Sequence, residues 1–263
     1  MRNEFKFILA IVSLAMMNSS CKVQETIAEI PEVQRIVTGS AEKSIYTSDF
    51  SDTSILNLNY NYYEPADSSF KDSVNQMIYR FVQSFTEFEG EDEMLPLNEA
   101  FFSNQLDSFA MISDADYDDM SSSLWSLMAD ITIKDNYLSF LELTFAGWSY
   151  TGGAHGNGFL NVHMYDKSTG ELLGLEDFFS SIPELTAIAE GYFRKAVEID
   201  ADQDLNDAGF WFDENKYHLT NNFFFDGTDL IIFYNTYEVA PYSGGAIEVS
   251  IPREKYLHLL KRM

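Results

Sequence analysis

The hydrophobic pattern of this chain changes its period several times, and this change limits the folds that it can adopt. Over 45–64 apolar residues alternate with polar ones, which predicts one or two strands ending at Pro65. Over 70–88 apolar residues recur every three or four positions instead, which predicts an amphipathic helix, and 97–112 shows the same spacing. The fold must therefore combine strands with helices.

The alternating pattern returns after the second helix. Segments 124–133 and 137–148 flank the tight turn Asp135-Asn136, so we expect a long hairpin. Further strands are expected at 159–165, 223–225, 230–234 and 246–251, and further helices at 184–199 and 254–260. Connections of hairpin length favour antiparallel pairing, and no strand–helix–strand series demands a parallel sheet. The predicted fold is α+β, with antiparallel sheets and packed helices in a single compact body of two related halves.

Composition narrows the class of partner. Hydrophobic residues make up 46% of the chain, enough for a buried core. Acidic residues number 42 against 16 basic ones, which gives a formal charge of −26. A surface of this sign repels phosphate backbones, so we expect no nucleic-acid partner.

The first twenty residues have the three parts of a signal peptide. Arg2 and Lys6 precede an apolar run over 7–17, and small polar residues follow before Cys21. Eleven apolar residues in a helix span roughly 16 Å, about half of a hydrocarbon core, so the run is too short for an ordinary membrane span. Residues 1–20 are therefore predicted to direct export to the cell envelope and to be removed.

The single cysteine lies where the acylated first residue of a lipoprotein would lie. Cys21 has no second cysteine with which to form a disulfide, so we predict that it is lipidated and anchors the chain to a membrane. Asn18 departs from the leucine that is usual in such motifs, and the alternative is simple cleavage that leaves a free thiol. Residues 21–44 are predicted to be a tether.

Two stretches resemble a known extracytoplasmic domain. The first is Tyr150-Thr151-Gly152-Gly153-Ala154-His155-Gly156, followed by Asn161 and the turn Thr169-Gly170. The second is Tyr237-Glu238-Val239-Ala240-Pro241-Tyr242, followed by a glycine, a strand and a helix. Together they resemble the domain found in lysozyme-sensing anti-sigma factors of the RsiV type and in the non-catalytic part of PdaC-type peptidoglycan deacetylases. The resemblance implies a PdaC-like α+β module at 45–149 and an RsiV-like α+β module at 150–263.

The resemblance also implies a function. It points to envelope sensing, or to binding of a lysozyme-like cationic protein or peptidoglycan. The chain departs from the anti-sigma factors because it starts with a signal peptide, which puts transmembrane signalling in doubt. The deacetylase's catalytic domain is separate, and no His-x-x-x-His pair occurs in this chain. We therefore expect no catalytic residue, metal ligand or cofactor.

Aromatic residues in and beside these stretches are the candidate ligand contacts: Trp148, Tyr150, His155, Tyr237 and Tyr242. Aromatic side chains next to glycine loops give large contact areas at low entropy cost. The alternative is that they pack under the loops as scaffold, with His155 as a hydrogen-bonded structural histidine. Residues 202–213 place oxygen ligands at alternate positions but lack the glycine and final glutamate of a calcium loop, so we expect a solvated loop.

Two other functions stay open at this point. The chain could be an enzyme that acts on cell-wall glycan through paired carboxylates, although sequence spacing cannot show the required separation. It could also be a structural envelope protein without a small ligand. An exposed aromatic patch near the two stretches would favour binding, whereas a cleft holding His155 and two carboxylates would favour the enzyme.

Overall fold

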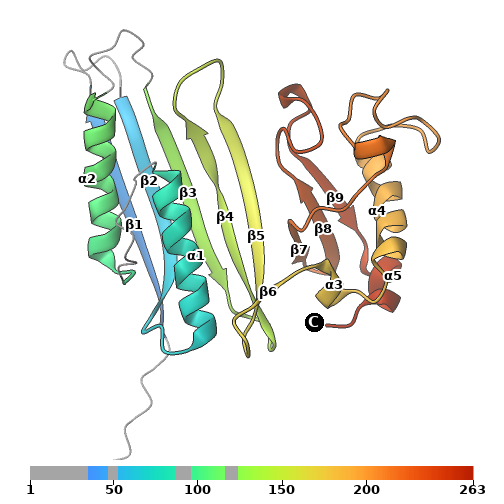
Figure 1. The fold of residues 1–263 in the computed structure, drawn as a ribbon, viewed down its shortest axis with the longest axis horizontal. Coiled ribbons are helices and arrows are strands. Elements are labelled where there is room, and N and C mark those ends of the chain that lie inside the picture. The colour runs from blue at the N-terminus through green and yellow to red at the C-terminus, as the bar shows by residue number, and fades with distance from the viewer. Residues whose placement is uncertain (1–34, 47–52, 87–95, 116–123, 263) are drawn as a thin grey trace, which may run out of the picture. The chain divides into compact units, whose positions relative to one another are not determined.

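The computed structural model describes residues 35–46, 53–86, 96–115 and 124–262 (Figure 1). Six strands form the first sheet: β1 (Arg35–Tyr46), β2 (Thr53–Glu64), β3 (Ser126–Lys134), β4 (Phe140–Tyr150), β5 (Asn157–Asp166) and β6 (Leu172–Leu173). They lie in the order β1-β2-β3-β4-β5-β6. The mixed α+β class expected from the hydrophobic pattern is confirmed.

One pair of neighbouring strands in this sheet is parallel. β2 pairs with β3 in parallel, with Ile55 beside Ser126 and Asn59 beside Asp130, whereas every other pair is antiparallel. The sequence analysis expected antiparallel pairing throughout. The two helices between β2 and β3 return the chain to the end of the sheet where β2 began, and such a crossover allows parallel neighbours.

Helices α1 (Ser69–Phe85) and α2 (Glu99–Ala115) cover one face of this sheet (Figure 1). Both were predicted, with ends shifted by a few residues. The alternation along β2 turns Leu56, Leu58 and Tyr60 towards the helices, where all three are buried. Tyr60 lies on the ring of Phe102 from α2, with ring centroids 3.5 Å apart. This face is the first core of the molecule.

A smaller antiparallel sheet follows: β7 (Phe223–Asp226), β8 (Asp229–Tyr234) and β9 (Ile247–Ile251). Its helices are α3 (Leu175–Phe178), α4 (Ile182–Ala196) and α5 (Arg253–Tyr256), and short 3-10 turns lie at Asp213–Asn215, Tyr242–Gly244 and Leu257–Leu259. The hydroxyl of Ser181 accepts from the backbone N–H of Glu184 and so caps α4. Around Phe193 of α4, buried aromatic rings form the second core.

Strand β5 contributes to both cores. Val162 and Met164 pack into the second core, whereas the alternate residue Tyr165 packs into the first. Successive side chains of a strand point to opposite faces, so the two cores lie on opposite sides of β4 and β5. Residues 34–263 accordingly form one compact unit.

Two predicted boundaries fall inside strands. Residues 35–44 were assigned to a tether but form most of β1. The division after Ser149 falls inside β4, one residue before its end at Tyr150, and β4 pairs with β5 in one sheet. The predicted signal peptide, Cys21 and residues 22–34 lie outside the described residues. Within the described part of the chain, no helix is long and apolar enough to cross a membrane.

Candidate functional site

The two glycine-containing stretches meet in space. The rings of His155 and Tyr242 stack with centroids 3.5 Å apart and an interplanar angle of 17°. The hydroxyl of Tyr237 lies 3.1 Å from Nε2 of His155. We call His155, Tyr237 and Tyr242 the junction cluster; the sequence analysis named all three as candidate ligand contacts but could not place the stretches together.

Hydrogen bonds fix the orientation of the imidazole ring. Nδ1 of His155 lies 3.2 Å from the carbonyl oxygen of Gly156, which can only accept a hydrogen bond. Nδ1 therefore carries a proton, and in the neutral ring Nε2 accepts from the Tyr237 hydroxyl. The Tyr242 hydroxyl donates to the same carbonyl oxygen at 3.0 Å. Gly156 thus links both loops, and both ring nitrogens of His155 have hydrogen-bond partners.

Tyr237 is held in an unusual backbone conformation at the tip of its loop. Its φ is +69°, in the left-handed region that a bulky residue rarely adopts. A turn supports it: the backbone N–H of Asn235 donates to Oε2 of Glu238 at 2.9 Å, and the N–H of Glu238 donates to the carbonyl oxygen of Asn235 at 3.0 Å. The side chain of Tyr237 is 48% exposed. Backbone strain of this kind occurs often at binding sites.

Trp148 lies beside the junction cluster on β4. A Cβ atom on Gly156 would lie 2.3 Å from the Trp148 ring, so the backbone of Gly156 packs directly on the indole. Only glycine allows this approach. Trp148 remains 37% exposed. Through this contact, Trp148 on β4 is linked to the backbone next to His155 in the junction cluster.

Tyr150 has a supporting role in this geometry. Its hydroxyl donates to the carbonyl oxygen of Gly153 at 3.1 Å. Gly152 and Gly153 have φ values of +105° and +95°, which the turn requires of glycine. Tyr150 and Tyr242 are half-buried and use their hydroxyls inside the protein, whereas Trp148 and Tyr237 expose more of their surface. The five candidate residues thus divide into exposed contacts and supporting groups.

Two asparagines that the sequence analysis did not name hold the sheets together. Oδ1 of Asn235 accepts from the N–H of Leu160 at 2.8 Å, and its Nδ2 donates to the carbonyl oxygen of Leu160 at 3.0 Å. Oδ1 of Asn222 accepts from the N–H of Val162 at 2.9 Å, and its Nδ2 donates to Phe233 O at 3.1 Å. These side chains satisfy the backbone of β5 as a neighbouring strand would. Single asparagines in loops give no sequence pattern that could have identified them.

Trp211 is another exposed aromatic residue absent from the sequence analysis. Its side chain is 50% exposed, and its backbone N–H donates to the carbonyl oxygen of Val239 at 2.9 Å. That bond ties the segment before β7 to the Tyr237 loop. The nearby loop proposed as solvated is closed by its own polar groups: Asp204 Oδ1 accepts from Asp207 N, and Asn206 Nδ2 donates to Phe212 O.

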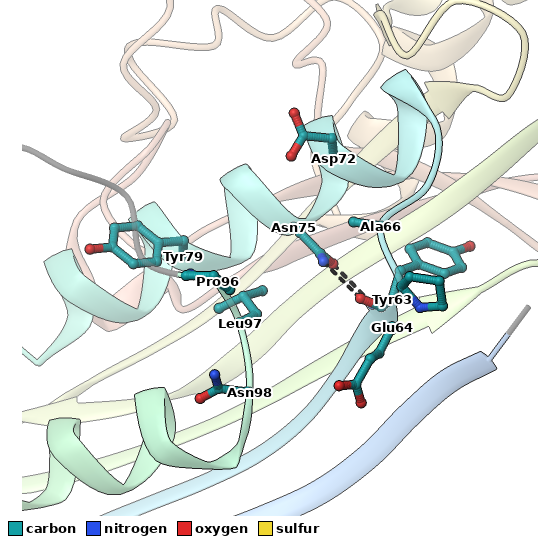
Figure 2. A pocket seen from close by; sticks show the side chains of 10 residues that line it. Tyr63, Glu64, Ala66, Asp72, Asn75, Tyr79, Pro96, Leu97 and Asn98 are labelled. Atoms are coloured by element: carbon teal, nitrogen blue, oxygen red, sulfur yellow. Dashed lines mark hydrogen bonds between the residues drawn. The ribbon is translucent and has the colours of Figure 1, made fainter.

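A separate pocket of about 370 Å³ lies between the end of β2, α1 and the start of α2 (Figure 2). Figure 2 shows the amide of Asn75 turned to the backbone of Tyr63, from which it accepts and to which it donates at 2.9 Å. The Tyr63 hydroxyl donates to Asp135 at 3.1 Å, and burial raises the pKa of Tyr63. Because its buried amide and hydroxyl are already paired, this pocket offers few groups to a ligand.

In the described part of the chain, no carboxylate hydrogen-bonds to the rings of the junction cluster. Glu238, the nearest acidic residue along the chain, binds the N–H of Asn235 through its carboxylate. Across the described ranges, no group of three or more histidine, cysteine, aspartate or glutamate side chains could hold a metal ion. The junction cluster therefore offers a ligand aromatic contacts and hydrogen bonds.

Comparison with known proteins supports the fold. A family model described as a protein of unknown function (DUF3298) matches residues 176–254, which include the Tyr237 stretch but not the Tyr150 stretch. A DUF3298 family member from Bacteroides fragilis NCTC 9343 is 19% identical, with a TM-score of 0.58 over 87% of this chain and 94% of its own. A DUF3298 family protein from Pseudomonas aeruginosa PAO1 is 16% identical, with a TM-score of 0.57 over 88% and 95%. No curated protein matches the chain. The C-terminal part of the chain therefore carries a DUF3298 match, and the chain shares the fold of two DUF3298 family proteins.

Proposed function

We propose that this protein is an exported, lipid-anchored binding protein of the cell envelope that uses the junction cluster to dock a lysozyme-like cationic protein. The proposal rests on the contacts among His155, Tyr237 and Tyr242, which lie on two loops distant in sequence. Rigid aromatic residues at a fixed surface position are frequent hot spots of protein interfaces. The resemblance to RsiV-type and PdaC-type domains supports the same reading.

Charge supports a cationic partner over an anionic one. The chain carries 42 acidic and 16 basic residues, so its field attracts positively charged proteins. Glu238 is exposed directly beside Tyr237. Such complementarity speeds encounter and weakens with salt. Peptidoglycan is the other ligand that the resemblance implies, and it is tested separately from lysozyme.

The binding test compares Tyr237, an exposed residue of the junction cluster, with an exposed residue of the β3–β4 turn. Immobilised protein is exposed to lysozyme and, separately, to purified peptidoglycan sacculi. Tyr237→Ala should weaken lysozyme capture at least about tenfold, because an anchor residue commonly contributes ~2 kcal/mol. Leu138→Ala is the matched control, since Leu138 is 97% exposed at the β3–β4 turn. It should leave capture unchanged.

Salt and stability measurements complete the test. Capture should weaken as ionic strength rises above ~0.1 M, where screening shortens to about 10 Å. The melting temperature of Tyr237→Ala should stay close to the wild-type value, because the side chain is half exposed. Absence of lysozyme capture at low salt, or equal capture by both variants, would overturn the assignment of this surface. Capture of sacculi alone would replace the protein ligand with a glycan one.

The anchor is tested separately. Labelling cells with a fatty-acid analogue should mark the protein, and Cys21→Ser should lose the label and the membrane association together. Equal recovery of both proteins in the membrane fraction would contradict lipidation at Cys21. That result would leave the binding test unaffected, because the two depend on different parts of the chain.

A further inference from the structure

No described residue outside the sheet covers the face of β1, β2 and β3 that lies opposite to α1 and α2. The alternation that buries Leu58 and Tyr60 turns Asn57, Asn59 and Asn61 to this other side. In the strand register, Thr38 and Ser40 on β1 lie beside Asn61 and Asn59, and Asp130 on β3 lies beside Asn59. Thr132 on β3 lines the same depression. An open depression of about 620 Å³ is formed here.

The depression is polar, and hydrogen bonds fix the orientation of its asparagine side chains. Nδ2 of Asn59 donates to Oδ1 of Asp130 at 2.7 Å, and Nδ2 of Asn61 donates to the hydroxyl of Thr38 at 3.0 Å. Oδ1 of Asn61 accepts from the N–H of Ile133 at 3.1 Å. These bonds hold the amide planes in place, which reduces the entropy that a ligand would have to offset.

Several groups in the depression keep unused hydrogen-bonding capacity. The hydroxyls of Ser40 and Thr132 make no hydrogen bond to another side chain in the described ranges, and Asn59 uses one of its two amide hydrogens on Asp130. A carboxylate accepts through both oxygens, and Asp130 receives Asn59 on only one. The surface thus offers donors and acceptors side by side, as neighbouring hydroxyl groups require.

The charge of the lining selects against anionic ligands. Asp130 is the only charged residue among those lining the depression, and no lysine or arginine is present to bind phosphate or carboxylate. Lys134, further along β3, is already paired with Glu142 at 2.6 Å. A neutral ligand rich in hydroxyl groups fits this lining better than an anion.

An apolar platform adjoins the polar groups. Met128 is 44% exposed and pairs in register with Trp148, one row along the sheet from Asp130. Trp148 lies one strand across and two residues along from Asp130, which puts their backbones about 8 Å apart, so the indole and the carboxylate can contact neighbouring units of one extended ligand. Aromatic rings give sugar rings an apolar surface for their C–H groups. Trp148 is itself held by the backbone of Gly156.

We infer that the open face of β1, β2 and β3 binds a neutral oligosaccharide, with Asn59 and Asp130 bonding its hydroxyls and Trp148 carrying an adjoining sugar ring. This surface is distinct from the junction cluster, and its ligand does not depend on whether the junction cluster binds protein. The polar lining, the single carboxylate and the neighbouring indole together favour a neutral oligosaccharide.

Calorimetric titration of the purified full chain with N-acetylglucosamine tetramer and with cellotetraose tests this inference. At least one should bind, and Asp130→Ala and Asn59→Ala should each weaken its binding at least about tenfold. Both residues are exposed, so these variants should fold. Asn104→Ala is the matched control, because Asn104 is an exposed asparagine of α2 on the other side of the sheet. The side-chain amide NMR signals of Asn59 and Asn61 should shift on titration.

Further outcomes separate this surface from the junction cluster. Saccharide affinity should stay within about twofold when Tyr237 is replaced by alanine or when salt is raised, because a neutral ligand is not screened. Failure of both tetramers to bind would overturn the inference. So would equal losses in Asp130→Ala and Asn104→Ala, or a loss in Tyr237→Ala alone. None of these results bears on lysozyme capture, which the Tyr237→Ala and Leu138→Ala pair tests.

Discussion

The two cores lie on opposite faces of β4 and β5, and they are closed in different ways. The first lies under α1 and α2 and is built on long strands with apolar residues at alternate positions. The second surrounds Phe193 with rings from loops as well as strands, including Phe210, Phe212 and Tyr217. In the described ranges β4 and β5 are covered on both faces, whereas the other face of β1, β2 and β3 is open. Both proposed binding surfaces lie where this second covering ends.

We expect the largest loss of stability from a substitution that leaves a cavity in the second core. Phe193→Ala removes a ring that is fully buried among four aromatic neighbours, and we expect a loss of about 3–5 kcal/mol in the free energy of unfolding. Phe224→Ala, at a partly buried position on β7, should cost clearly less. Denaturant unfolding measures both variants.

The same variant tests whether the cores are coupled. Because β5 contributes to both, native-state hydrogen exchange should show loss of protection in β2 and β3 as well as in β8. If only the amides of β7, β8 and β9 lose protection, the two regions are independent and the single-unit description is wrong.

A second change removes the link between the sheets while leaving both cores intact. Asn222→Ala deletes bonds to Val162 N, Leu160 O and Phe233 O, and we expect a loss of about 2 kcal/mol because partly buried backbone groups are left unpaired. Exchange of the Val162 amide should accelerate most. Asn104→Ala, on an exposed helix surface, should change neither quantity.

The C-terminal end gives a smaller, pH-dependent effect. Hydrogen bonds from Ser168 and from Arg262 lower the pKa of Asp166 well below its usual range. This stabilisation is present above the unfolded pKa of about 4 and is lost as the pH falls below it. Arg262→Ala should therefore cost about 1 kcal/mol at neutral pH, and the difference from wild type should shrink in acid. A constant difference down to pH 2 would show that Arg262 acts through packing instead.

His163 gives the smallest expected effect and reports on the first core. Burial lowers its pKa, so the folded state disfavours the protonated ring. Stability is complete above the unfolded pKa of about 6.5 and is lost as the pH falls towards the folded pKa. His163→Gln should lose less stability than wild type between pH 7.5 and pH 5.5. Parallel thermal melts at these two pH values measure the difference, and identical pH dependence would show that His163 contributes nothing to it.

Sequence reasoning succeeded where local periodicity is strong. Segments 124–133 and 137–148 were predicted as a hairpin and form β3 and β4. Buried and exposed residues alternate along β3, whereas β4 begins with four buried residues because both of its faces are covered. β1 was missed because it is an edge strand whose only buried residue is Val37, so a pattern of buried positions is absent. The parallel pairing of β2 with β3 was also missed. It joins residues about seventy positions apart, and no local pattern reports such a contact.

The candidate site was predictable in part for a related reason. The stretches around His155 and Tyr242 contain unusual glycine and aromatic combinations, which identified both loops. Their contact depends on Gly156 accepting bonds from His155 and Tyr242 and packing on Trp148, which only the folded backbone shows. The Asn57, Asn59 and Asn61 series was treated as part of a strand. Its importance depends on which face the helices leave uncovered.

The division of β5 between two cores limits how its length can change. Inserting or deleting one residue between Leu160 and Met164 would turn the residues beyond it over, sending Tyr165 into the second core and Met164 into the first. Both cores would then be filled with side chains of the wrong shape at once. Insertions or deletions in β5 are tolerable only when they involve two residues. The exposed glycine loop before β5 can accept single inserted residues at its tip, near Gly153, because a Cβ atom there would meet nothing within 4 Å. Natural variation in length among chains of this fold should accordingly collect in that loop and avoid the strand.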